Sequence, residues 1–152
     1  MSRNAALYDS DFFEWTKHQA ETLREAGPRL GNVADLDIEH LAEEIEDMGK
    51  RDLREAESRI QRIIEHLLKL EHSPAVEPRA GWSTTVEEQR LQLKLVLRDS
   101  PSLRRRIDLG YLYPGARDLA VRSLARDKVE PHAVPQTCPY SLEYIEKGQP
   151  PS

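Results

Sequence analysis

The chain has 152 residues, of which 32% are charged, and its formal net charge at pH 7 is −5. This length predicts one domain over residues 1–152, and the negative charge argues against nucleic acid as the default partner. The lone Cys138 excludes an internal disulfide, and charges interrupt every apolar stretch before it reaches the length of a membrane span. Since no apolar signal segment begins the chain, we expect a cytoplasmic protein that does not enter the membrane.

The first predicted helix begins near Asp9 or Asp11, because either carboxylate can accept hydrogen bonds from the free N–H groups of a helix start. It is predicted to end near Ala26, since Gly27 and Pro28 follow directly. The glycine favours a helix end and the proline removes a backbone donor, so a loop is expected next.

The longest predicted element is a central helix over about 37–71, which Asp35 or Asp37 can cap after a loop at 27–32. This segment contains no proline and its only glycine is Gly49. At 100° per residue its apolar side chains keep one phase throughout, namely Ile38, Leu41, Ala42, Ile45, Met48, Leu53, Ala56, Ile60, Ile63, Ile64, Leu67 and Leu68. One continuous helix is therefore predicted, with a bend at Gly49 left open.

A third helix is predicted from capping residues at 83–85 to about Arg98. Leu91 and Leu95 lie nearly opposite its main apolar face, which predicts burial on two sides. That main face consists of Val86, Leu93 and Leu97.

A further helix is predicted to start at Ser100-Pro101 and to be kinked or split at Pro114-Gly115. The core is expected over about 8–128, followed by a proline-rich tail over 129–152 that ends in a short turn around 141–146. The sequence thus predicts an all-α helical bundle built around one long central helix, with three to four shorter helices and an extended C-terminal tail.

Polar residues interrupt the apolar stripe of the central helix. Asp52, Arg59 and His66 recur every seven residues along one edge of the stripe, and Glu44 flanks this row. Arg90 lies within the apolar face of the third helix, so its guanidinium is expected to meet a carboxylate such as Asp52 or Glu44. We name the predicted interhelical set of Glu44, Asp52, Arg59, His66 and Arg90 the polar seam.

The polar seam allows two interpretations. In the first, its groups pair and fix the register of the bundle, and the protein is an interaction or regulatory module that binds an unknown protein partner or itself. In the second, the seam lines a cleft and hydrolyses RNA or another phosphate ester, with His66 as general acid or base and Arg59 or Arg90 holding charge. The sequence contains no recognisable catalytic motif, which favours the first interpretation.

His40, Glu43 and Glu44 form a weaker candidate set for a metal ion, because their spacing places them on neighbouring turns of one helix. A second helix would have to complete the metal's coordination shell. A solvated charged face is the favoured interpretation, and neither a metal nor a cofactor is predicted.

Several local runs together resemble one known family. They are Tyr8-Asp-Ser-Asp-Phe12, Leu41-Ala-Glu-Glu-Ile-Glu-Asp-Met-Gly-Lys50, His66-Leu-Leu-Lys69, Asp99-Ser-Pro-Ser-Leu103 and Cys138-Pro-Tyr140. From about Tyr8 to Ile145 the chain resembles the bacterial domain-of-unknown-function family twenty-nine. The resemblance implies an all-α bundle without an established activity. It also implies that the signature residues include Glu43, Glu44, Arg59, His66, Trp82 and Arg90.

Overall fold

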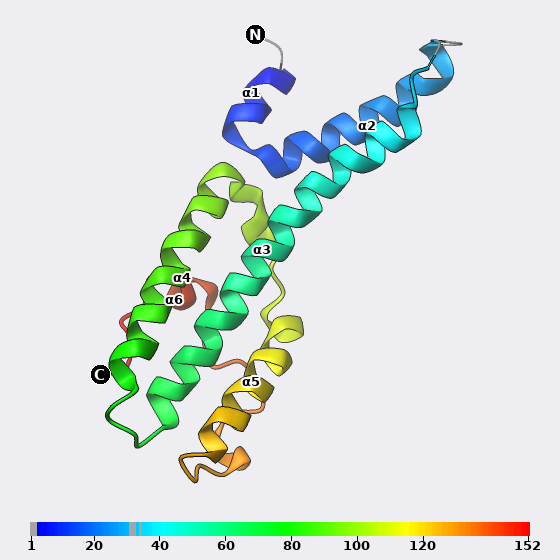
Figure 1. Ribbon diagram of the computed structural model, residues 1–152. Helices are drawn as coiled ribbons and strands as arrows, with labels where there is room; N and C mark the ends of the chain where they lie inside the picture. The colour runs from blue at the N-terminus through cyan, green and yellow to red at the C-terminus, as the bar shows by residue number, and fades with distance from the viewer. Residues whose placement is uncertain (1–2, 31–32, 34) are drawn as a thin grey trace. The chain divides into compact units, whose positions relative to one another are not determined.

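The computed structural model describes residues 3–30, 33 and 35–152, and within these ranges the chain forms helices and no strand. The all-α prediction is therefore confirmed, including the long central helix. The α-helices are α1 (Arg3–Ser10), α2 (Phe12–Leu30), α3 (Ile38–His72), α4 (Arg79–Asp99), α5 (Leu109–Ala125) and α6 (Leu142–Lys147), and the 3₁₀ helices are η1 (Pro101–Arg106) and η2 (Pro131–Ala133) (Figure 1).

The chain divides into two compact units, each described here by itself. Unit 1 comprises Met1–Glu55 and Val96–Arg106, and unit 2 comprises Ala56–Leu95 and Ile107–Ser152. Both α3 and α4 contribute residues to each unit. That residues 1–152 form a single domain stays a prediction.

The central helix α3 matches the predicted range of 37–71 closely and runs through Gly49. Its start is capped as expected, because Oδ1 of Asp37 accepts a hydrogen bond from the backbone N–H of His40 at 3.2 Å. The other candidate cap, Asp35, instead has a positive φ of 65° in the preceding turn. Uninterrupted helical periodicity was thus a sufficient signal for this element.

Gly49 lies at a close contact between α2 and α3 in unit 1. A Cβ at this position would collide with Oγ1 of Thr16 and would lie 3.2 Å from the ring of Phe13. Glycine is normally unfavourable inside a helix, but here it lets two backbones come together. The two helices pack side by side along this line (Figure 1).

The Gly49→Ala variant is expected to lose about 1–3 kcal/mol of unfolding free energy, because the added methyl overpacks the α2–α3 contact by more than its helix propensity stabilises α3. Gly81→Ala is the matched control, since a Cβ at that helical position of α4 meets no other atom within 4 Å. The control is expected to be neutral or slightly stabilising in the same urea titration. Equal stability of both variants would show that α2 moves aside without cost.

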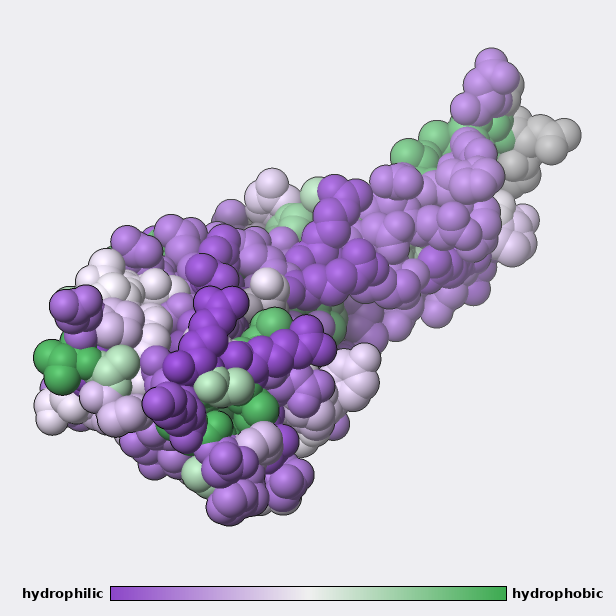
Figure 2. Space-filling view, turned by 60° about the horizontal axis from the view of Figure 1, so that its bottom comes forward, coloured by the Kyte–Doolittle hydropathy of each residue, from purple (hydrophilic) through white to green (hydrophobic). Residues whose placement is uncertain are grey.

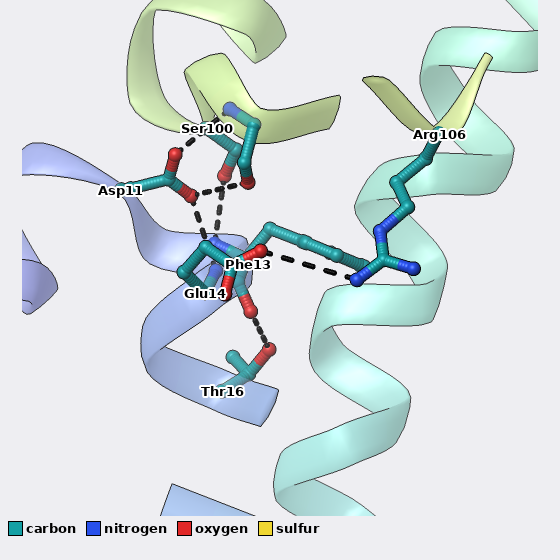
Figure 3. A network of polar contacts seen from close by, with 7 residues as sticks. Asp11, Phe13, Glu14, Thr16, Ser100 and Arg106 are labelled. Atoms are coloured by element: carbon teal, nitrogen blue, oxygen red, sulfur yellow. Dashed lines mark hydrogen bonds and ion pairs between the residues drawn. The ribbon is translucent and has the colours of Figure 1, made fainter. Parts of the chain in front are cut away.

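Asp11 joins the start of α2 to η1 within unit 1. Its Oδ1 accepts the backbone N–H of Glu14 at 3.1 Å and the hydroxyl of Ser102 at 2.8 Å, while Oδ2 accepts the N–H of Ser102 at 2.8 Å (Figure 3). The hydroxyl of Ser100, which is fully buried, accepts the N–H of Phe13 at 3.0 Å. The predicted cap at Asp11 is confirmed, with three hydrogen bonds instead of one.

α2 ends at Leu30, so the prediction that it stops near Ala26 was wrong. Pro28 lies in the last turn, where its missing N–H removes only one hydrogen bond of the helix. A Cβ at Gly27 would lie 3.5 Å from the side chain of Ile38, so α3 packs against this last turn. Of the loop predicted at 27–32, residues 31 and 32 lie outside the described residues.

The core of unit 2 is built from α3, α4, α5 and the C-terminal tail. Each contributes side chains with at most 3% of their surface exposed. They include Ile60, Ile63, Ile64, Leu67 and Leu68 of α3, Val86 and Leu93 of α4, Leu112, Tyr113, Ala116, Ala120 and Leu124 of α5, and Val134 and Ile145 of the tail. The short turn predicted around 141–146 is the helix α6, capped by Ser141.

Two expectations about α4 were wrong. The helix begins at Arg79, so the hydroxyls of Thr84 and Thr85 donate to carbonyl oxygens one turn back instead of capping its start. Leu91 and Leu95 are 64% and 46% exposed, so α4 is covered on one side only. A helical wheel gives the direction of a side chain and not whether another element covers it.

α5 continues without a break through Pro114 and Gly115, where a kink or split was predicted. The flanking turns are held from outside the helix. Asp108 caps its start, and Nε2 of Gln61 donates to the carbonyl of Leu112 at 3.0 Å. The helix predicted to start at Ser100-Pro101 is the short 3₁₀ helix η1, and α5 begins only after Asp108.

Candidate functional site

A cluster of charged and aromatic side chains lies in unit 2, where α3 faces the first turns of α4. Nζ of Lys69 lies 3.2 Å from a carboxylate oxygen of Glu65 and 5.6 Å from the ring centroid of Trp82. His66 lies 3.9 Å from the second oxygen of Glu65. His66 and Lys69 are 6% and 8% exposed, so the charges are paired in a largely water-free place. We name Glu65, His66, Lys69 and Trp82 the buried charge cluster.

His66 is held as a neutral side chain in this cluster. Burial lowers the pKa of His66 below its ordinary value, and the positive charges of Lys69 and Arg62 also lower it, whereas the hydrogen bond to the Arg62 carbonyl and the charge of Glu65 raise it. Nδ1 lies 2.9 Å from the carbonyl oxygen of Arg62. A carbonyl only accepts hydrogen bonds, so Nδ1 carries the proton of the neutral ring. The burial and the backbone contact fit a packing role, and they give no support to the hydrolase hypothesis.

Arg90 is half-buried, and its predicted pairing with a carboxylate was wrong. Nε donates to the carbonyl oxygen of Ile145 and Nη2 to that of Tyr144, both at 2.8 Å. Both carbonyls belong to α6, and the carbonyl of Tyr144 also accepts the backbone N–H of Gly148 at 2.7 Å. Arg90 therefore fastens the tail to α4.

Arg59 contacts α4 at the surface of unit 2. Its Nη1 donates to Oε1 of Gln89 at 3.2 Å. Both side chains line a shallow, open pocket together with Glu88, Leu91 and Gln92. The pocket includes neither His66 nor Arg90, so these seam residues of unit 2 do not share one cleft there.

The two seam residues of unit 1, Glu44 and Asp52, differ in exposure and in their charged neighbours. Glu44 is 73% exposed and lies 3.7 Å from Arg51. Asp52 is half-buried, and its pKa is raised by burial and then by the like charges of Glu55 and Asp99. The seam interpretation required Asp52 to be the counter-ion of an arginine. The charges that act on Asp52 are instead those of other carboxylates.

Asp52→Asn is expected to raise the unfolding free energy at pH 7 by up to about 1 kcal/mol, because it removes a charge that the fold disfavours. A folded-state pKa above the unfolded value means that the folded protein binds the proton first, so wild-type stability from this group rises as pH falls through the raised pKa. The gain of the variant should then shrink towards pH 4 in urea titrations. Asp118→Asn, at an exposed site, is the control, and a loss of stability on changing Asp52 would contradict the assignment.

The weak metal candidates are not brought together. His40 turns back to Asp37, with Nδ1 at 2.5 Å from its carboxylate, and both are largely exposed. Glu43 and Glu44 are also exposed. Within residues 3–30, 33 and 35–152, no group of three or more His, Cys, Asp or Glu side chains is arranged to hold a metal ion.

The sequence analysis did not predict that Glu65 and Lys69 of the buried charge cluster pair with each other. Glu65 and Lys69 are four residues apart on α3, the spacing of a helical ion pair, so their pairing could have been found. The contact of Lys69 with Trp82 joins two helices and has no signal in the spacing.

The α2–α3 hairpin of unit 1 carries a second candidate surface. On one side of the line where the helices touch, Arg24 lies 3.5 Å from Glu39 and 3.1 Å from Glu46. At 100° per residue, five apolar residues lie on the other side of that line. They are Ala26 and Leu30 of α2, and Leu41, Ile45 and Met48 of α3. We name these five residues the apolar edge.

The apolar edge is only partly covered. Leu30, Leu41 and Met48 are 47%, 43% and 40% exposed, although the same side of α3 is buried further along at Ile63. Figure 2 shows hydrophobic surface at the end of this hairpin, whereas much of the hairpin seen from that side is hydrophilic. The hairpin is therefore two-sided, with a charged side and an apolar one.

α1 covers the hairpin beside the apolar edge with an aromatic cluster. The Tyr8 ring packs edge-on against Phe12 and Trp15, with centroids 5.9 and 4.9 Å apart. Phe12 and Trp15 lie on the same side of α2 as Leu30. The helix α1, which was not predicted from the sequence, therefore covers the N-terminal end of that side. The C-terminal end of the same side, at Leu30, is exposed.

No helix within the described residues has both the length and the apolar character needed to cross a membrane. The described residues form helices and no strand, so the protein is all-α and of the helical-bundle class. Residues 7–148 match the family described as Domain of unknown function DUF29, and the chain belongs to that family.

A crystal structure of an α-helical protein of unknown function from Rhodospirillum rubrum is similar in fold, with a TM-score of 0.80. The two sequences are 32% identical, over 91% of this chain and 88% of that chain. No functionally curated protein matches the sequence. The resemblance seen in the sequence is thus confirmed.

Proposed function

We propose that this protein is a helical interaction module of the cytoplasm, which acts by binding a protein through the apolar edge of the α2–α3 hairpin. The observation that carries the proposal is the exposure of Leu30, Leu41 and Met48 along one side of a two-helix hairpin. Two helices cannot enclose their own apolar side chains, so a third surface is needed to cover them.

The buried charge cluster supports this function rather than an enzymatic one. Its histidine is neutral, 6% exposed, and bonded to the backbone of its own helix. A general acid or base must reach the substrate within hydrogen-bonding distance. The cluster therefore serves as a polar packing device between α3 and α4.

Site-specific photocrosslinking in the native cell tests the proposal. A photoreactive amino acid at position 41 lies on the apolar edge, whereas the same group at position 43 lies about 200° further round α3. We expect protein crosslinks from position 41 and none from position 43, where Glu43 is exposed. If neither position yields a protein crosslink, the proposed function fails.

A further inference from the structure

The chain's own tail shows how one surface of unit 2 holds an extended segment. Gly148 follows α6 with φ −69° and ψ 156°, which is the polyproline II conformation, and Pro150 and Pro151 come soon after it. A Cβ on Gly148 would collide with the ring of Tyr144, so the segment passes directly over that ring. We name residues 148–152 the proline segment.

The carbonyl groups of the proline segment accept hydrogen bonds from side chains around it. The hydroxyl of Tyr144 donates to the carbonyl of Gln149, and Nη2 of Arg79 donates to that of Ser152, both at 2.8 Å. The rings of Tyr140 and Tyr144 stack, with centroids 5.4 Å apart. A polyproline II segment has no internal hydrogen bonds, so its carbonyls are free to accept from side chains, and aromatic-lined grooves are the usual binding sites for such segments.

The proline segment leaves part of this groove unfilled. Pro151 forms one wall of a pocket of about 650 Å³, and the rings of Tyr140 and Tyr144 form other walls. Among the described residues that line the pocket, Glu71 carries the only carboxylate and there is no lysine, arginine or histidine. A longer segment with a basic residue beside its prolines would therefore contact more of the groove, since a cation binds both a carboxylate and a tyrosine ring.

The proline segment is held loosely enough for a partner to replace it. Gln149 and Ser152 are exposed, and the other three residues are half-buried. Both hydrogen bonds to its carbonyls lie at exposed positions, where water competes for the same groups. A segment that buries little surface and whose hydrogen bonds face water opens at a low cost in free energy.

We propose that the groove formed by Tyr140, Tyr144 and Glu71 binds a proline-rich segment of a partner protein, which carries a basic residue and displaces the chain's own proline segment. This site belongs to unit 2, whereas the residues of the apolar edge belong to unit 1, so the proposal goes beyond the proposed function and does not rest on it. Without such a partner, the proline segment covers the tyrosines.

Titration of the full chain with a synthetic peptide of six prolines and a terminal arginine tests the proposal. The chemical shifts of the ring protons of Tyr140 and Tyr144 report binding by NMR. Saturable shifts with a Kd on the order of 0.1–1 mM are expected, because the chain's own segment competes at a high effective concentration. A peptide with alanine in place of every proline should bind about tenfold more weakly, since it lacks the preformed extended conformation.

Gly148→Ala tests the competition directly. The added Cβ collides with the ring of Tyr144 and so displaces the proline segment, while the residues of the groove are unchanged. The variant is therefore expected to bind the proline peptide about fivefold more tightly than wild type. Gly81→Ala is the matched control, because a Cβ there meets no atom within 4 Å, and its Kd should equal that of wild type.

Glu71→Gln tests the recognition of the basic residue. Glutamine keeps an acceptor for the hydroxyl of Tyr140, which donates to Glu71 at 2.6 Å, but it carries no charge. The Kd of the arginine-containing peptide should therefore rise by about three- to tenfold. Glu130→Gln makes the same change of charge at an exposed residue outside the pocket lining, and it should leave Kd unchanged.

The proposal is overturned if neither wild type nor Gly148→Ala gives saturable shifts, or if Gly148→Ala binds no more tightly than wild type. Equal binding of the alanine peptide and the proline peptide, or equal affinity of wild type and Glu71→Gln, would likewise contradict the stated ligand. None of these variants changes the apolar edge, so photocrosslinking from position 41 remains a separate test of the proposed function.

Discussion

Replacing Asp11 with alanine is expected to lower the unfolding free energy by about 2–4 kcal/mol. The carboxylate accepts three hydrogen bonds, one from the start of α2 and two from Ser102 of η1. A helix cap alone is worth about 1 kcal/mol, and each further bond to a charged acceptor adds a comparable amount. The N–H of Ser102 would also be left without its acceptor.

Asp37→Ala provides the comparison for Asp11→Ala in a urea titration. Asp37 caps α3 with one backbone bond at a fully solvated position, so its midpoint should shift much less. Asp11→Asn keeps one carbonyl oxygen and should fall between alanine and wild type. If the alanine variants at 11 and 37 lost equal stability, the bonds to Ser102 would contribute nothing.

Arg90→Ala is expected to cost about 2–4 kcal/mol, because it removes both donors from the carbonyls of Tyr144 and Ile145. Ile145 is fully buried, so loosening α6 also uncovers part of the core of unit 2. Burial lowers the pKa of Arg90, yet the guanidinium stays charged at all ordinary pH values.

Two variants sharpen this result, again measured by denaturant titration. Arg90→Lys keeps the charge but cannot span two carbonyl oxygens with a planar fork, so an intermediate loss is expected. Arg98→Ala changes an arginine of the same helix whose side chain is 70% exposed, and it should be neutral. Were Arg90→Ala as mild as Arg98→Ala, water would be able to replace the guanidinium.

The elements that could be predicted are those with strong local signals. α3 has an unbroken apolar phase and an aspartate before its first turn, and the turn at α6 has a capping serine. α2 continues beyond its predicted end for two reasons. Pro28 removes only one helical hydrogen bond in the last turn, and Gly27 packs against Ile38 of α3. That packing partner comes from a separate helix, so the local sequence carries no sign of it.

The polar seam was only half predictable. The wheel placed Arg90 correctly inside a buried face, but the oxygens it meets belong to the backbone, and backbone carbonyls leave no mark in the residue types. The wheel likewise set Asp52 on a half-buried edge, where its neighbours raise its pKa instead of pairing with it. Angular position predicts burial better than it predicts the partner.

The tail's share in the core of unit 2 bears on how the chain folds as it is synthesised. Val134 and Ile145 are buried in the core that residues 56–125 help to form. The carbonyls to which Arg90 donates follow it by more than fifty residues in the chain. Unit 1 has all its segments once Arg106 has left the ribosome. Unit 2 must expose part of its apolar interior until α6 emerges, so we expect its core to close only after Ile145 has left the ribosome.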